Sequence, residues 1–300
     1  MSFKAFVKSP VSWLYLGGAV LLVVGLMVWC MRVSVTPQRV FWGTVSRGLV
    51  TSGVTIKSEQ DGNGINAKQT MQFSVGVNTN NASHALTTLT QGKTVVQNEM
   101  IASSTTDYVR YVNITTDQKK ANGKPIDFSK VFGVWAAGPA NSGQFFAQSV
   151  LGSSLPVGGI VVPIGNLPAS QRSEMIKEIK NDNVYQVAFD KTKKQHVDGR
   201  LQYVYEVTVR PSAYIAMIKQ FAHEAGLHGL EQVDPSAYAA QKPFKFLMTI
   251  DARSRQVVYV STTDSTSHQT YTSYDVPVQA DIPKNAITTA KLQQLLSNLQ

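Results

Sequence analysis

The sequence predicts an α+β fold, in which a curved antiparallel β-sheet (a half-barrel) is covered by helices and preceded by one N-terminal transmembrane helix. Three observations lead to this prediction. Residues 11–31 are uncharged, several later segments alternate apolar and polar residues with a period of two, and amphipathic helical segments lie between them. Strands with one apolar face suit an antiparallel sheet with one covered side.

Residues 11–31 read as a membrane anchor. In helical conformation this run is long enough to cross a hydrocarbon core of about 30 Å. A lipid-modified cysteine follows a small residue, but Cys30 follows Trp29. No small-x-small cleavage site follows the apolar run either. We therefore expect an uncleaved signal-anchor. Residues 1–10 are then a short cytoplasmic tail and residues 32–48 a juxtamembrane linker. We expect a single-pass protein of the cell membrane with its C-terminal domain extracytoplasmic.

The charge balance favours a membrane setting over nucleic acid. The chain has 28 Lys and Arg against 19 Asp and Glu, a formal net charge of +9. These basic residues neither gather on a recognition helix nor alternate with stacking aromatics, so nucleic acid is not an expected partner. Because Cys30 is the only cysteine and lies in the anchor, the sequence predicts no disulfide.

A β-rich domain is expected over residues 49–285. Its first part reads as a five-strand antiparallel meander, with the turn sequence DGNG ending the first strand. In the second strand Met71, Phe73 and Val75 share one face. The expected strands are residues 50–60, 70–77, 85–90, 94–102 and 106–114.

Helical segments follow the meander. Residues 115–140 have no clear period, residues 142–151 suggest a short helix, and residues 167–180 suggest a longer one that Ser170 could cap. A further helix is expected to begin at Pro211 and to end at Gly226. Its apolar side carries Tyr214 and Met217. We expect the two later helices to cover the sheet.

Two strands near these helices are rich in aromatic residues and methionine. Tyr203 and Tyr205 share one face of the strand over residues 201–209, and Phe246 and Met248 share one face of the next. Shorter strands continue to about residue 274, and residues 286–300 contain a C-terminal helix.

The sequence does not predict an enzyme. His223 and His228 are five residues apart, whereas a zinc-protease helix needs a spacing of four. Neither a G-x-S-x-G elbow nor a phosphate-binding glycine loop occurs. We therefore expect no catalytic residue, no metal site and no cofactor.

Residues 200–285 resemble the lipoprotein-carrier-like (LolA/LolB-like) superfamily, which includes LppX/LprG-type lipid-binding lipoproteins. The likeness lies in the order of strands and helix and in the ending Tyr271-x-x-Tyr274-x-x-Pro277-x-x-x-x-Ile282-Pro283. The meander over residues 50–114 is compatible with the family's first strands. The resemblance implies a half-open antiparallel barrel with helices as a lid and a hydrophobic cavity between sheet and helices. The anchor in place of a lipid-modified cysteine departs from the family and argues against a freely diffusing shuttle.

Our leading hypothesis is a non-catalytic, membrane-anchored lipid- or lipoprotein-binding protein of the bacterial cell envelope. Its expected partners are a lipid or acylated molecule, the membrane and envelope proteins. An apolar cavity needs no special residue to hold an acyl chain, because burial contributes about 0.8 kcal/mol per methylene. The side chains predicted to line the cavity are Met71, Phe73, Val75, Tyr203, Tyr205, Tyr214, Met217, Phe246 and Met248.

Two alternatives remain open at this stage. The same apolar faces could form a fully packed core, which would favour an extracytoplasmic interaction or sensing module in envelope assembly. A cluster of basic residues could be a solvated hairpin tip or could contact an anionic surface. The cluster contains Lys191, Lys193, Lys194 and Arg200.

Overall fold

The computed structural model describes residues 35–62, 64–76, 81–103, 105–139, 160–227, 230, 233–264, 266–278 and 281–299. The predicted anchor over residues 11–31 and the predicted short helix over residues 142–151 lie outside these residues. Among the helices that are described, none is both long enough and apolar enough to cross a membrane.

The strands of the described residues form one open sheet, in the order β13-β6-β5-β4-β3-β2-β1-β12-β11-β10-β9-β7, with β8 paired to β9 outside this path. The pairing is antiparallel except between β13 and β6. The strands are β1 Gly53–Gly62, β2 Ile65–Ser74, β3 Ala82–Gln91, β4 Thr94–Ser103, β5 Asp107–Thr115, β6 Ala136–Ala137, β7 Tyr185–Val187, β8 Lys193–Val197, β9 Arg200–Val209, β10 Phe244–Asp251, β11 Gln256–Thr262, β12 Ser267–Thr272 and β13 Ile287–Thr288.

The predicted five-strand meander is confirmed. β1 to β5 pair in sequence order, and Met71 lies between Ile56 of β1 and Ala85 of β3 on the same face. Gly92 adopts a φ of 58° in the tight turn between β3 and β4, a conformation that glycine adopts without the steric cost of a Cβ. At its other side the meander continues directly into the later strands, because β1 pairs with β12.

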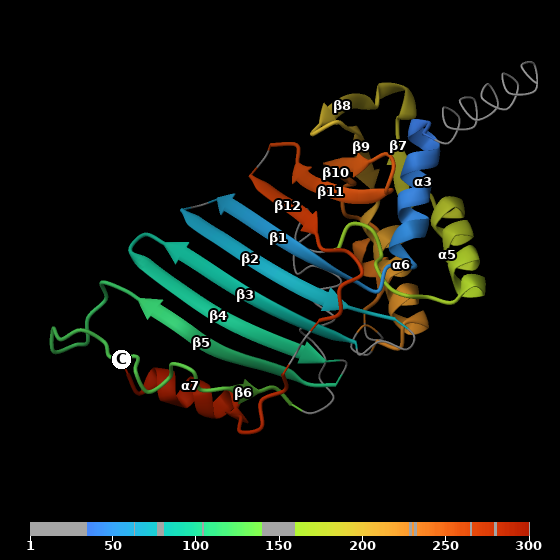
Figure 1. The fold of residues 1–300 in the computed structure, drawn as a ribbon. Helices are drawn as coiled ribbons and strands as arrows, with labels where there is room; N and C mark the ends of the chain where they lie inside the picture. The colour runs from blue at the N-terminus through green and yellow to red at the C-terminus, as the bar shows by residue number, and fades with distance from the viewer. Residues whose placement is uncertain are drawn as a thin grey trace, which may run out of the picture.

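The helices lie at two ends of this sheet (Figure 1). α3 Pro37–Gly48, α5 Ala169–Asn181 and α6 Pro211–Glu224 gather beside β9 to β12, whereas α7 Thr289–Ser297 lies beyond β5. Two 3₁₀ turns, η1 Phe189–Lys191 and η2 Pro235–Tyr238, complete the elements. The mixed α+β class with helices on an open sheet agrees with the sequence prediction.

Two local predictions differ from the structure. The linker expected over residues 32–48 is instead α3 from Pro37 onward, with Val40, Phe41 and Val45 fully buried. These side chains recur at helical spacing, so the segment packs as one helix face and does not act as a flexible spacer. Ser170 does not cap α5, because the N-cap is Pro168, which provides no side-chain hydrogen bond.

The described residues contain two separate apolar cores. The larger lies between the sheet and α3, α5 and α6. The smaller packs α7 against β5, β6 and the preceding loop, and its buried members are Val131, Ala136, Leu292 and Leu299. The segment over residues 115–140, which sequence analysis could not place, therefore helps to build the second core.

Candidate functional site

The nine side chains predicted to line a cavity lie together in the larger core. Each is between 0% and 5% exposed, on β2, β9, β10, α6 or the residues just after β2. The sequence therefore predicted correctly which faces turn inward. The structure brings together Met71, Phe73, Val75, Tyr203, Tyr205, Tyr214, Met217, Phe246 and Met248.

An irregular segment runs through this core, and we call residues 160–167 the inner strap. Its large apolar side chains are only 1–3% exposed. On the helix side the strap backbone pairs with α3, since the amide of Gly165 donates to the Gly48 carbonyl at 3.0 Å. On the sheet side the amide of Asn166 donates to the Val75 carbonyl at 3.0 Å, just after β2. The strap is therefore bonded to the end of α3 on one side and to the residue after β2 on the other.

Tyrosine hydroxyls hold the start of the strap. The Tyr185 hydroxyl donates to the Val161 carbonyl at 2.7 Å, and the Tyr214 hydroxyl donates to the Ile160 carbonyl. Burial raises the pKa of both tyrosines well above the ordinary value, so each stays protonated as a donor. These bonds give partners to backbone carbonyls that would otherwise be buried without one.

Close packing leaves little free space around the middle of the strap. A Cβ placed on Gly165 would lie 2.6 Å from the ring of Phe221 on α6. Leu167, two residues further, donates its amide to the Leu49 carbonyl at 3.0 Å and is 3% exposed. The strap thus fills the apolar space that the sequence suggested for a ligand.

The first described residues are fastened to β9. The Tyr203 hydroxyl donates to the Val35 carbonyl at 2.6 Å, and the Tyr205 hydroxyl donates to the Pro37 carbonyl at 2.9 Å. Burial raises the pKa of Tyr203 and Tyr205, which keeps both hydroxyls protonated. Two residues predicted as cavity lining thus also fix where the chain enters the domain.

The basic residues singled out by sequence lie on and beside the β8–β9 hairpin. Every residue of β8 is exposed, including Lys193 and Lys194, and Lys191 and Arg200 are exposed nearby. No ion pair to any of these four side chains is formed by the described residues. The hairpin therefore presents a net positive charge, which Asp190 and Asp198 in the same stretch offset only in part.

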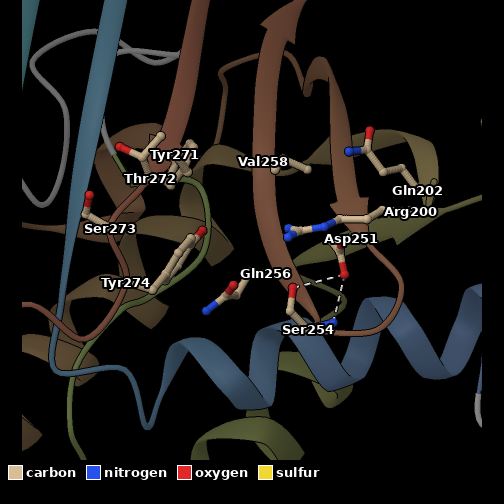
Figure 2. Close-up of a pocket in the computed structure, with 10 residues that line it drawn as sticks. All are labelled: Arg200, Gln202, Asp251, Ser254, Gln256, Val258, Tyr271, Thr272, Ser273 and Tyr274. Atoms are coloured by element: carbon tan, nitrogen blue, oxygen red, sulfur yellow. Dashed lines mark hydrogen bonds between the residues drawn. The ribbon is translucent and has the colours of Figure 1, made fainter. Parts of the chain in front are cut away.

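A polar pocket of about 330 Å³ opens beside the turn end of this hairpin (Figure 2). The side chain of Arg200 extends toward Asp251 and Gln256, and Tyr274 lies on the opposite side. The Asp251 carboxylate accepts from the amides of Arg253 and Ser254 at 3.0 and 2.8 Å. Because its lining is mostly polar, this pocket suits a polar group and is not the predicted acyl cavity.

Sequence reasoning missed the inner strap and α3. The strap has no alternation to detect, because both of its sides are buried and neighbouring Val161 and Val162 are both 2% exposed. In α3 an apolar stripe was present, but Pro37, Gly43 and two arginines suggested a linker. In the described part of the chain, no group of three or more His, Cys, Asp and Glu residues could hold a metal ion.

Comparison with known proteins gives structural likeness at low sequence identity. LprF from Mycobacterium bovis is similar with 10% identity and a TM-score of 0.42, over 83% of this chain and 97% of LprF. A LolA superfamily protein from Nitrosomonas europaea is similar with 9% identity and a TM-score of 0.24, over 85% of this chain and 99% of that protein. No family model and no curated protein matches the sequence.

Proposed function

We propose that this protein is a membrane-anchored, extracytoplasmic lipid-binding protein that holds an acyl chain of a lipid or lipoprotein between its sheet and its helices, without catalysis. The inner strap is the observation that carries the proposal. Phe41 of α3 meets Tyr205 of β9 directly, with ring centroids 5.5 Å apart. Beside this contact an apolar segment without regular secondary structure is enclosed in the same core.

The space that the strap occupies has the chemistry that an acyl chain needs, because the surrounding side chains are apolar or aromatic. Since protein interiors contain few voids, displacement of the strap would leave a space that another apolar group must fill. An acyl chain would replace the strap without any specific polar contact.

The acyl chain and the strap gain burial free energies of similar size. An acyl chain of about sixteen carbons contributes roughly 13 kcal/mol on burial. The five large apolar side chains of the strap contribute roughly 8–15 kcal/mol on the same scale. They are Ile160, Val161, Val162, Ile164 and Leu167. Because neither occupant dominates, the strap hydrogen bonds, at about 1 kcal/mol each, can decide the exchange.

The test is uptake of a fluorescent fatty acid by the full chain in nanodiscs. Tyr185→Phe combined with Tyr214→Phe removes two strap hydrogen bonds with little change of volume and is expected to tighten binding, by about fivefold for each bond lost. Tyr274→Phe is the matched control, because its hydroxyl donates to Val257, outside the strap. No uptake by any of these proteins would contradict the proposal.

A second function is favoured by the burial of all nine predicted cavity residues. In an interaction or sensing module of the envelope the strap would be a permanent part of the core. That alternative predicts a lipid-free mass in native mass spectrometry of the full chain and no fatty-acid uptake. Lipid retained through purification would exclude it.

The extracytoplasmic location can be tested separately. Thr263 is exposed and precedes β12. A cysteine introduced there should react with a membrane-impermeant thiol reagent in intact cells. Reaction only after the cells are lysed would place the domain on the cytoplasmic side.

A further inference from the structure

The β8–β9 hairpin forms a ribbon at the side of the sheet, in which β9 also pairs with β10 from Gln202 onward, so that only the turn end of the hairpin extends past that pairing (Figure 1). β8 pairs with β9 alone, and its register joins Lys193 to Val204 and Val197 to Arg200. All five residues of β8 are exposed, so neither face of this strand contributes to the core. An exposed ribbon of this kind is available for contact with a surface outside the domain.

The charge on the ribbon is positive and unpaired. Lys191, Lys193 and Lys194 are exposed, and within the described part of the chain no carboxylate forms an ion pair with them. Two aspartates, Asp190 and Asp198, lie in the same stretch and offset only part of this charge. The Lys194 ammonium lies over the ring of Tyr203, 5.9 Å from the ring centroid. Because the ring is neutral, this contact does not cancel the positive charge of the lysine.

The ribbon is fixed beside the first described residue. Lys194 is the β-pairing partner of Tyr203, whose hydroxyl holds the Val35 carbonyl at 2.6 Å. The predicted anchor ends at residue 31, and a chain from residue 31 to residue 35 can extend at most about 14 Å. Lys194 is therefore placed close to the point where the chain leaves the predicted anchor, and Lys191 and Lys193 belong to the same hairpin segment.

We propose that the β8–β9 hairpin docks on the anionic headgroups of the membrane in which the chain is anchored. The inference depends on the anchor in the proposed function but not on acyl binding. Electrostatic attraction to anionic lipid acts within about one Debye length, roughly 8–10 Å, so a short tether is what lets these lysines engage. Each lysine at the surface is expected to contribute a factor of about five to the association.

Lysine acetylation of the full chain tests the contact. The protein is placed in nanodiscs of neutral phosphatidylcholine or of phosphatidylcholine with anionic phosphatidylglycerol, and modification of each lysine is followed by mass spectrometry. Acetylation of Lys191, Lys193 and Lys194 should slow several-fold in the anionic discs. Lys93 should react equally in both, because its side chain is 82% exposed in the β3–β4 turn at the far end of the meander (Figure 1).

A charge-reversal pair separates docking from a general effect of charge. Lys193→Glu with Lys194→Glu should abolish the protection of Lys191 in anionic discs. The matched control, Lys119→Glu with Lys124→Glu, makes the same charge change at exposed positions after β5 and should leave Lys191 protected. High salt should remove the protection in the native protein.

Equal acetylation rates of the three lysines in neutral and anionic discs would overturn the proposal, as would a chain that does not remain in the discs. Fatty-acid uptake is read out separately, so failure of docking and failure of acyl binding can be told apart. If the hairpin docked on the bilayer but the protein took up no fatty acid, the result would support the alternative function, an interaction module held at the membrane.

Discussion

The two halves of the sheet have the same antiparallel pairing but differ in what covers them. In β9, Tyr203, Tyr205, Val207 and Val209 are buried in strict alternation beneath the helices and the strap. In β4 only Ile101 and Ala102 are buried, and no residue of β5 is. Helical cover, more than strand pairing, therefore decides where this domain has its main core.

The meander half depends more on polar cross-strand contacts. The Gln69 amide donates to the Thr87 hydroxyl at 3.1 Å across β2 and β3. Glu99 on β4 binds Arg110 of β5 at 2.5 Å and His84 of β3 at 2.8 Å, with its side chain 16% exposed. Such contacts contribute less per residue than burial of a large apolar side chain.

Truncation of a core side chain should show the largest difference between the halves. Phe246→Ala, at a position 1% exposed, is expected to lower the free energy of unfolding by about 3–5 kcal/mol. Leu89→Ala in β3, at a position 41% exposed, should cost less than about 1 kcal/mol. Chemical denaturation of the full chain measures both. Equal losses would show that the halves do not differ in packing.

Overpacking at the strap should have the next largest effect. Gly165→Ala would place a methyl group against the Phe221 ring, with an expected loss of about 1–3 kcal/mol. Gly62→Ala at the end of β1 is the control, because nothing lies within 4 Å of the added Cβ. A neutral Gly165→Ala in thermal unfolding would mean that the strap is loosely held.

The partly buried carboxylate of Glu99 in the meander should give a smaller, pH-dependent effect. Glu99→Gln leaves Arg110 without its charge partner and is expected to cost about 1–2 kcal/mol at neutral pH. Glu206→Gln breaks the exposed ion pair with Lys245 and should cost less than about 0.5 kcal/mol.

The sign of the pH effect follows from the pKa of Glu99. Burial raises this pKa, but hydrogen bonds from Arg110 and His84 together lower it below the ordinary value. The contribution of the carboxylate is therefore complete above the unfolded glutamate pKa of about 4.3, and is lost as the pH falls through the lower folded pKa. Urea titrations over this acidic range should show this loss in the native protein and not in Glu99→Gln.

Loss of a helix cap should give the smallest effect, confined to the second core. The Thr288 hydroxyl accepts from the Lys291 amide at 3.2 Å at the start of α7. Thr288→Ala is expected to cost about 1 kcal/mol. Hydrogen exchange should accelerate in α7 and stay unchanged in α6. A matching change in α6 would mean that the two cores unfold together.

Local periodicity was enough to predict the elements that have one buried face. The alternation of Met71 and Phe73, and of Tyr203 and Tyr205, located the inward faces of β2 and β9. The inner strap has no such alternation, because it is enclosed on both sides. Which residues line the interior was therefore predictable, whereas what fills it was not.

The pairing of strands that are distant in the sequence could not be predicted from local sequence patterns either. Nothing in residues 55–60 specifies residues 267–272 as their partner, because strand partners are chosen by tertiary context and not by local pattern. β6 and β13 contain two residues each, which is too short for any periodic signal. Their place at the sheet edge depends on the packing of α7.

The pairing of β1 with β12 has a consequence for how the chain folds. This single ladder joins segments that are far apart in the described chain and connects the meander to β12, β11, β10, β9 and β7. Its loop-closure entropy grows only slowly with the length enclosed, but contacts between distant segments form slowly. The meander can pair as soon as residue 115 has been synthesised, whereas the sheet becomes one unit only after residue 272. During synthesis β1 therefore offers an unpaired edge, the kind of surface on which aggregation begins.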